Sequence, residues 1–156
     1  MNGGSVWLAG LLVIVGWAVV HTLTARRDRD KARREMVSKA IDGIAESLSK
    51  IHEAARHYHL EERNVPAELQ LKNSLQDFSM CLVGLGPVCA AKEREALGRC
   101  NRDAGTLRRA ITGKHFEDEH TEPLEPGAEQ LQDIAEAYLN AKRNLLQLKY
   151  AQFPLS

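Results

Sequence analysis

An unbroken apolar run near the N-terminus limits what this chain can fold into more than any other feature. From Val6 to Leu23 the sequence reads VWLAGLLVIVGWAVVHTL, eighteen residues without Asp, Glu, Lys or Arg. At about 1.5 Å of rise per residue, a helix of this length reaches roughly 27 Å, close to the hydrocarbon thickness of a bilayer. A helix on a soluble core would carry a polar stripe, yet this run has none before His21. The sequence therefore predicts a transmembrane helix over residues 6–24.

The main alternative is a cleaved signal peptide, and the uncharged start of the chain argues against it. A signal peptide begins with a basic segment, followed by an apolar region of about 7–15 residues. Residues 1–5 carry no charged side chain, and the apolar run is longer than such a region. We therefore expect an uncleaved anchor, with residues 1–5 as a short external N-terminus.

Basic residues gather directly behind the apolar run, in a juxtamembrane segment over residues 25–35. The charged residues of this segment are Arg26, Arg27, Arg29, Lys31, Arg33 and Arg34 against Asp28, Asp30 and Glu35. Basic residues close to a membrane span remain on the cytoplasmic side, which predicts that residues 36–156 are cytoplasmic. Indole rings and basic side chains favour the level of the lipid head groups. The residues predicted to lie at the membrane interface are Trp7, Trp17, Arg26, Arg27, Arg29 and Lys31.

The charge and composition of the chain limit which fold classes and which kinds of partner remain possible. The 21 basic and 21 acidic side chains balance, which removes the positive field expected of a nucleic-acid-binding protein. Aromatic residues are scarce, at 5%, while Ala, Leu, Glu, Lys, Arg and Gln are common, which favours helices over a β-sandwich or barrel. We therefore expect an all-α protein with no nucleic-acid partner.

Apolar residues at alternating spacings of four and three predict about four helices within residues 36–156. Such spacing places the apolar side chains on one face of each helix. The four stripes are Val37, Ile41, Ile44, Leu48, Ile51, Ala55 and Tyr58; Leu71, Leu75, Phe78, Leu82 and Leu85; Leu97, Cys100, Ala104, Leu107 and Ile111; and Leu131, Ile134, Tyr138, Ala141, Leu145 and Leu148. A single amphipathic helix is marginal in water, so the stripes are expected to pack together in an antiparallel helical bundle.

Turn-forming residues set the expected ends of these helices. The first should run to about Arg63, with Asn64 capping the next helix. Gly113 is expected to end the third helix in the left-handed conformation, and the fourth helix should cover about residues 126–152. The same spacing allows an alternative, in which the first helix is a long coiled coil that dimerises and the rest forms a smaller bundle.

Three cysteines, Cys81, Cys89 and Cys100, are odd in number and form no CxxC pair. A disulfide framework needs an even number in an oxidising compartment, so reduced thiols fit a cytosolic domain better. We expect the cysteines to be buried on or beside apolar helix faces, where a thiol is inert.

Histidines are the main candidates for catalysis or metal binding. His52, His57 and His59 are spaced by five and two residues, whereas metal-binding pairs on a helix use spacings of three or four. His115 and His120 flank an acidic loop that lacks the glycine and the alternating acids of a calcium site. We expect solvated or cap-adjacent histidines and a non-enzymatic chain without catalytic, cofactor-binding or metal-binding residues. The alternative is a metal-dependent sensor or enzyme that uses these histidines and the acidic loop.

Several short stretches carry a further resemblance. They are Gly16-Trp17 and Val20-His21, Arg27-Asp28 and Arg33-Arg34-Glu35, Ala54-Ala55-Arg56-His57-Tyr58-His59, and Arg108 to Glu117 with a Thr-Gly-x-x-Phe-Glu segment. In these stretches the chain resembles uncharacterised bacterial single-pass membrane proteins with no known activity. The resemblance implies a location in the bacterial inner (cytoplasmic) membrane and a helical cytosolic part. It also draws attention to Thr112, Gly113, Phe116 and Glu117. In one interpretation Thr112 and Gly113 cap a helix and Phe116 folds back onto the bundle's end; in the other the four residues form a docking corner for a partner.

The working hypothesis is a membrane-tethered helical interaction module, which acts through protein–protein contacts at the cytoplasmic membrane surface. Tethering raises the effective concentration, so that weak contacts suffice. The expected partners are the lipid bilayer and another membrane or membrane-associated protein, with a homodimer as a secondary expectation. A further hypothesis is a membrane-perturbing effector or immunity protein of a mobile element.

Overall fold

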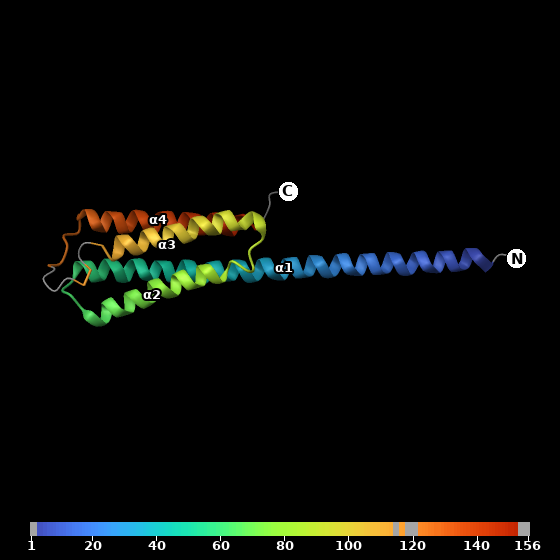
Figure 1. Ribbon diagram of the computed structural model, residues 1–156, viewed down its shortest axis with the longest axis horizontal. Coiled ribbons are helices and arrows are strands. Elements are labelled where there is room, and N and C mark those ends of the chain that lie inside the picture. Colours follow the sequence, from blue (N-terminus) through green and yellow to red (C-terminus); the bar gives the residue numbers. More distant parts are fainter. Residues whose placement is uncertain (1–2, 114–115, 118–121, 153–156) are drawn as a thin grey trace. The chain divides into compact units, whose positions relative to one another are not determined.

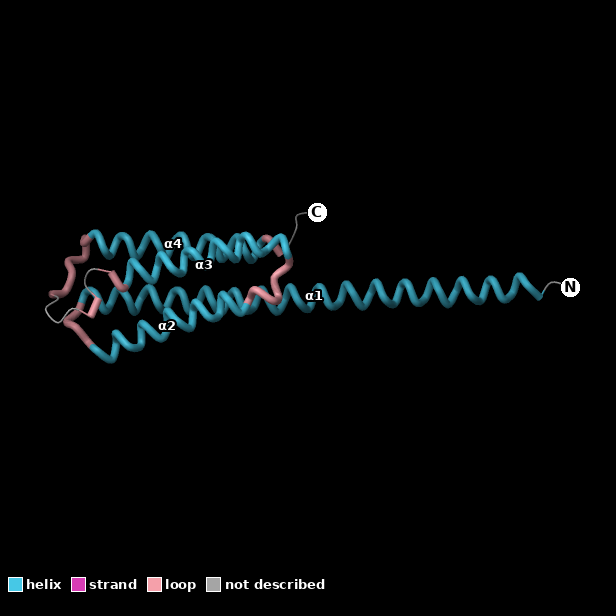
Figure 2. Tube along the Cα trace, in the orientation of Figure 1, coloured by secondary structure: helices cyan, strands magenta, loops and turns pink. Residues whose placement is uncertain are grey.

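The computed structural model describes the backbone of residues 3–113, 116–117 and 122–152, and the side chains of these residues except 3–16, 18 and 19. The chain divides into two compact units, Met1–Met36 and Val37–Ser156. The elements are α1 (Gly3–Leu60), α2 (Val65–Gly84), the 3-10 helix η1 (Ala91–Glu93), α3 (Arg94–Ile111) and α4 (Glu129–Tyr150). Figure 2 shows only helices and loops over the described residues, which confirms the all-α prediction.

The first unit contains the N-terminal part of α1. Trp17 and Val20 are exposed, and the Trp17 ring stacks on His21 with centroids 5.3 Å apart. In the part of the chain whose residues are described, none of the helices has the length and apolar character needed to span a membrane. Most side chains of the predicted span over 6–24, that of Trp7 included, lie outside the described part of the structure.

The second unit is a bundle of four helices. Residues 37–60 of α1, then α2, α3 and α4 alternate in direction, so that each helix is antiparallel to the next along the chain (Figure 1). Asn64 precedes α2 with an extended backbone, and its side chain accepts a hydrogen bond from the Ala67 amide at 3.3 Å. This satisfies one of the amide groups that a helix start leaves without a partner. The predicted cap on α2 is confirmed.

The core of the bundle is made of the predicted apolar stripes. All residues of the stripes on α1, α2 and α3 are buried, together with Ile134, Ala141, Leu145 and Leu148 of α4. Leu131 and Tyr138 lie at the edge of the α4 stripe and are half-buried. Since the four stripes face one another in a single core, the antiparallel bundle of about four helices is confirmed.

The ends of α1 and α4 differ from the approximate predictions by two or three residues, and one predicted cap is wrong. Helix α1 ends at Leu60, before Arg63, and α4 covers Glu129–Tyr150 and not 126–152. Among the described glycines none has a positive φ, so Gly113 is not in the left-handed conformation. Instead Thr112 ends α3 at φ −94°, with its amide donating to the Arg108 carbonyl. An ordinary helical hydrogen bond closes α3, and no left-handed residue is required.

The prediction of buried cysteines holds for two of the three. Cys89 and Cys100 are buried, and burial is the first cause that raises the pKa of the Cys100 thiol to about 11. Cys81 is exposed. It lies between Phe78 and Leu82 in sequence, and its position on α2 falls at the edge of the apolar stripe, next to solvent.

Candidate interaction surfaces

A buried polar cluster closes the end of the bundle where α1 ends and α2 begins. The Tyr58 hydroxyl donates to Glu68 Oε1 at 2.8 Å, and Arg63 Nε donates to the same oxygen at 2.7 Å. Glu68 is only 4% exposed, and burial of a carboxylate is costly unless it is paired. The Arg63 hydrogen bond holds the pKa of Glu68 below its usual value, against the opposing effect of burial. The cluster therefore fixes the α1–α2 turn around one ionised carboxylate.

Phe116 and Glu117 pack against this cluster. The Phe116 ring lies 5.1 Å from the Tyr58 ring, with the Lys72 ammonium 5.7 Å from its centroid. The Glu117 carboxylate pairs with Lys72, and its amide donates to the Tyr58 hydroxyl at 3.5 Å. Glu117 has a φ of 67°, a left-handed conformation that costs energy in a residue with a side chain. These contacts agree with the interpretation in which Phe116 folds back onto the bundle's end.

Thr112 and Gly113 lie beside this cluster, where α3 ends. The Thr112 hydroxyl donates to the Arg108 carbonyl at 2.9 Å. A Cβ on Gly113 would lie 3.1 Å from the Arg109 carbonyl oxygen, so a larger residue would crowd the end of α3. Gly113 also lines a cleft of about 290 Å³ with Glu129 and Asp133 of α4. The docking corner composed of these two residues with Phe116 and Glu117 stays a prediction.

The three histidines in the last turns of α1 have different environments, and only His57 among them is exposed. His57 is exposed and lies 3.0 Å from a Glu61 carboxylate oxygen. His59 is 3% exposed, and its Nε2 donates to the Ile111 carbonyl at 3.0 Å, since a carbonyl only accepts. His59 is therefore not solvated, but it lies next to the end of α1, as the cap-adjacent alternative expects. The backbone carbonyl of His59 also accepts from the Leu124 amide at 2.8 Å, so this residue ties α1 to α3 and to the segment before α4.

His52 is half-buried between α1 and α4. Its ring stacks on Tyr138 with centroids 4.2 Å apart, and the Tyr138 hydroxyl lies 3.3 Å from Ser49 Oγ. Burial and then the nearby Arg56 charge lower the pKa of His52, which favours the neutral imidazole. A cleft of about 250 Å³ adjoins the ring, with Arg56 and Pro126 in its walls. Stacking on a tyrosine explains the position of His52 without a ligand.

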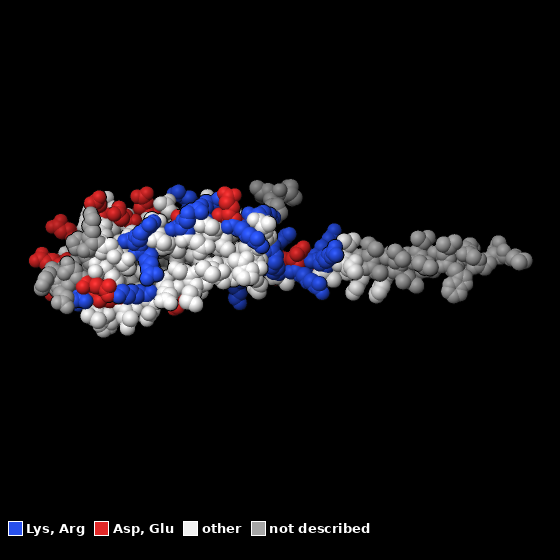
Figure 3. Space-filling view, in the orientation of Figure 1, with Lys and Arg blue, Asp and Glu red and all other residues white. Residues whose placement is uncertain are grey.

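Over the residues that the structure describes, no three His, Cys, Asp or Glu side chains are grouped to hold a metal ion. His115 and His120 lie outside the described residues. The alternative of a site shared by α1 and the acidic loop therefore stays open. Acidic side chains gather where α4 begins, at the left end of the bundle in Figure 3. Those of α4 are Glu129, Asp133 and Glu136.

An apolar groove of about 380 Å³ runs between α1 and α2 in the half of the bundle near the start of the second unit. Its lining residues are Ala40, Gly43, Ile44, Ser47, Phe78, Cys81, Gly84 and Leu85. Ile44, Phe78 and Leu85 are buried and form its floor, whereas Gly43 and Gly84 face open space, since a Cβ on either would meet nothing within 4 Å. The groove is thus open because its rim residues are small, two of them glycines.

Sequence reasoning missed this groove, although the chain carried a signal for it. Ala40, Gly43 and Ser47 follow the same alternation of three and four residues as the core stripe, shifted to its edge. Cys81 and Gly84 do the same on α2. Small residues at the edges of two neighbouring stripes leave a gap between two antiparallel helices, but which helices are neighbours is known only from the fold.

No protein-family model, curated protein sequence or solved structure matches this chain.

Proposed function

We propose that this chain is a membrane-tethered helical module, which binds a protein partner at the cytoplasmic surface of the bacterial inner membrane. The tether is the uncharged run Val6–Leu23, followed by the basic segment 25–35. Hydrocarbon is a better medium than water for such a run, and the arginines behind it resist transfer across the bilayer.

The observation that carries the binding role is the α1–α2 groove. Its walls are apolar, its floor is closed by buried side chains and its rim consists of glycine, alanine, serine and cysteine. An open groove of this kind accepts apolar side chains from another helix, as in helix-in-groove recognition. It is a better-supported contact surface than the corner at Phe116, whose side chain already packs against Tyr58 and Lys72.

Site-specific photo-cross-linking in native membranes tests the proposal. A photo-reactive residue replaces Ser47 in the groove, and a matched variant carries it at Thr106, an exposed position on α3. We expect protein adducts from position 47 and far fewer from position 106. Equal adduct yields from the two positions, or no protein adduct from position 47, would contradict a binding role for the groove.

A further inference from the structure

We infer that the α1–α2 groove is a self-association surface, which receives a second copy of this chain in a two-fold, parallel arrangement. The inference deepens the proposed function, because it names the partner at the same groove. A two-fold axis along the groove places α1 of each copy against α2 of the other. It also leaves both N-termini at the same end of the dimer, as tethering in one membrane requires.

The charges on the rim of the groove support a second copy as the occupant. Lys50 follows Gly43 by seven residues and Ser47 by three, which places it on the groove side of α1. Asp77 precedes Gly84 by seven residues and Cys81 by four, which places it on the groove side of α2. Lys50 and Asp77 are therefore opposite charges on the two sides of the groove.

The two charges also lie at the same level along the bundle. Ser47 and Phe78 both line the groove, and because α1 and α2 are antiparallel, Lys50 and Asp77 lie beyond them in the same direction. Counted from these two lining residues, Lys50 lies three residues of rise along α1 and Asp77 one residue along α2, a difference of about 3 Å. A two-fold axis along the groove preserves heights, so Lys50 of each copy faces Asp77 of the other.

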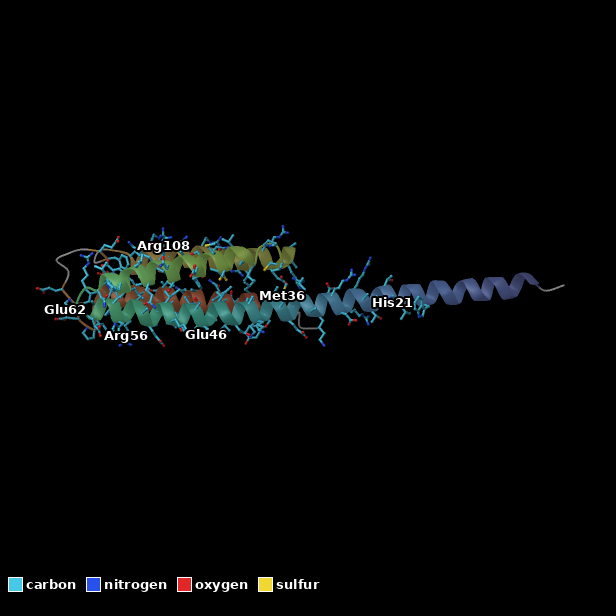
Figure 4. The ribbon with its side chains drawn as sticks, turned by 90° about the horizontal axis from the view of Figure 1, so that it is seen from below. His21, Met36, Glu46, Arg56, Glu62 and Arg108 are labelled. Atoms are coloured by element: carbon cyan, nitrogen blue, oxygen red, sulfur yellow. The ribbon has the colours of Figure 1, made fainter. Side chains whose placement is uncertain are left out.

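Among the described residues of one chain, Lys50 and Asp77 form no ion pair with each other. Lys50 bonds Glu46 at 2.7 Å across the exposed surface of α1, where both side chains remain mostly solvated. Glu46 projects from the outer side of α1, as the labelled side chain in Figure 4 shows. Asp77 is exposed, and the described residues offer it no ion pair. Exchange of the exposed Glu46 pair for an intermolecular pair with Asp77 costs little.

The small rim residues permit the close approach that such a dimer needs. In the two-fold arrangement Gly43 of one copy lies at the level of Cys81 and Gly84 of the other. Small residues opposite one another allow two helix axes to approach to the short end of the usual 8–10 Å range. The two apolar floors then face each other inside the interface, and no buried charge is left without a partner.

Energy transfer between labelled copies of the full chain tests this inference. The chain carries a donor or acceptor fluorophore at its C-terminus and is reconstituted in phosphatidylcholine–phosphatidylglycerol vesicles. We expect concentration-dependent transfer for the wild type. Lys50→Asp alone and Asp77→Lys alone should each raise the dimer dissociation constant by about tenfold, because each creates two like-charge contacts in the dimer. An equal mixture of the two variants should restore transfer, since both contacts are then between opposite charges.

Restoration by mixing cannot arise from contacts within one chain, so its failure overturns the inference. Gly43→Leu provides a second test that is independent of charge. Its side chain fills the groove of its own chain, and we expect transfer to be lost while the helix content is retained. Gly105→Leu is the matched control on α3, where a Cβ likewise meets nothing within 4 Å, and it should dimerise as the wild type does.

The outcomes separate this inference from the proposed function. A chain that inserts in vesicles but gives no transfer at any density contradicts self-association, while membrane tethering stands. A chain that fails to insert contradicts the proposed function. Self-association is then decided for the same variants by sedimentation in solution.

Discussion

Removal of the Glu68 carboxylate is the perturbation that tests the account of the bundle most sharply. Glu68 is buried and accepts hydrogen bonds from Tyr58 and Arg63. In Glu68→Ala the buried Tyr58 hydroxyl loses its acceptor, which costs about 1–3 kcal/mol. Loss of the charge-assisted bond from the partly exposed Arg63 adds about 1 kcal/mol. We therefore expect a loss of about 3 kcal/mol in the free energy of unfolding.

The same carboxylate makes the free energy of unfolding depend on pH. The pKa of Glu68 is lower in the folded chain than in the unfolded chain, because of the Arg63 hydrogen bond. Its contribution is therefore fully present above the unfolded pKa of about 4.3 and is lost as pH falls through the folded pKa. The wild type should lose stability from this group below about pH 4.3, and Glu68→Ala should lack that component.

Urea denaturation of the full chain in detergent, followed by circular dichroism between pH 3 and 7, measures both effects. Glu68→Gln is the matched control, because its carbonyl still accepts from Tyr58 while its charge is gone. It should be destabilised less than Glu68→Ala at pH 7 and should show the same loss of pH dependence. If Glu68→Ala unfolds at the wild-type urea concentration, or keeps the wild-type acid profile, the buried carboxylate does not stabilise this turn.

Three further predictions concern the core, the closing segment and the thiols. Leu107→Ala removes a fully buried side chain and should lower the free energy of unfolding in urea by about 2–5 kcal/mol. Leu146→Ala, at an exposed position, should change it by less than about 0.5 kcal/mol. Equal effects would contradict the core assignment. Phe116→Ala removes the ring that packs on Tyr58 and should speed protease cleavage between α3 and α4 while the helix content is unchanged, and an unaltered cleavage rate would argue against that contact. At pH 8 a maleimide should modify Cys81 in the folded chain. Cys100 should react only after unfolding, because it is buried and its pKa is raised to about 11. Rapid modification of Cys100, measured by mass spectrometry, would contradict its burial.

The helical bundle was predictable because apolar spacing and helix geometry obey the same rule. Every residue of the stripes on α1, α2 and α3 is buried, from Val37 to Ile111. The deviations occur at the edges. Tyr138 is half-buried because it stacks on His52, a contact between residues far apart in sequence. Cys81 is exposed because it lies beside the α2 stripe, and spacing alone does not show how wide a buried face is.

The polar contacts and the groove could not be predicted, because they depend on which helices become neighbours. Glu68 reads in the sequence as an ordinary surface acid in the first turn of a helix, and only the approach of Tyr58 makes it the centre of a cluster. His59 reads as a histidine near a helix end, and its burial requires the end of α3 to lie beside it. The groove depends in turn on the pairing of α1 with α2, since only the fold brings Gly43 and Gly84 to the rim of one groove.

Membrane topology tests the central claim most directly, that an uncharged helix tethers a cytoplasmic bundle. The full chain with a C-terminal tag is expressed in bacteria, and membranes are washed with alkaline carbonate before high-speed centrifugation. We expect the chain in the pellet, with the tag resistant to protease in intact spheroplasts and cleaved in inside-out vesicles. A chain found in the supernatant, or a tag cleaved from outside in intact spheroplasts, would contradict the claim.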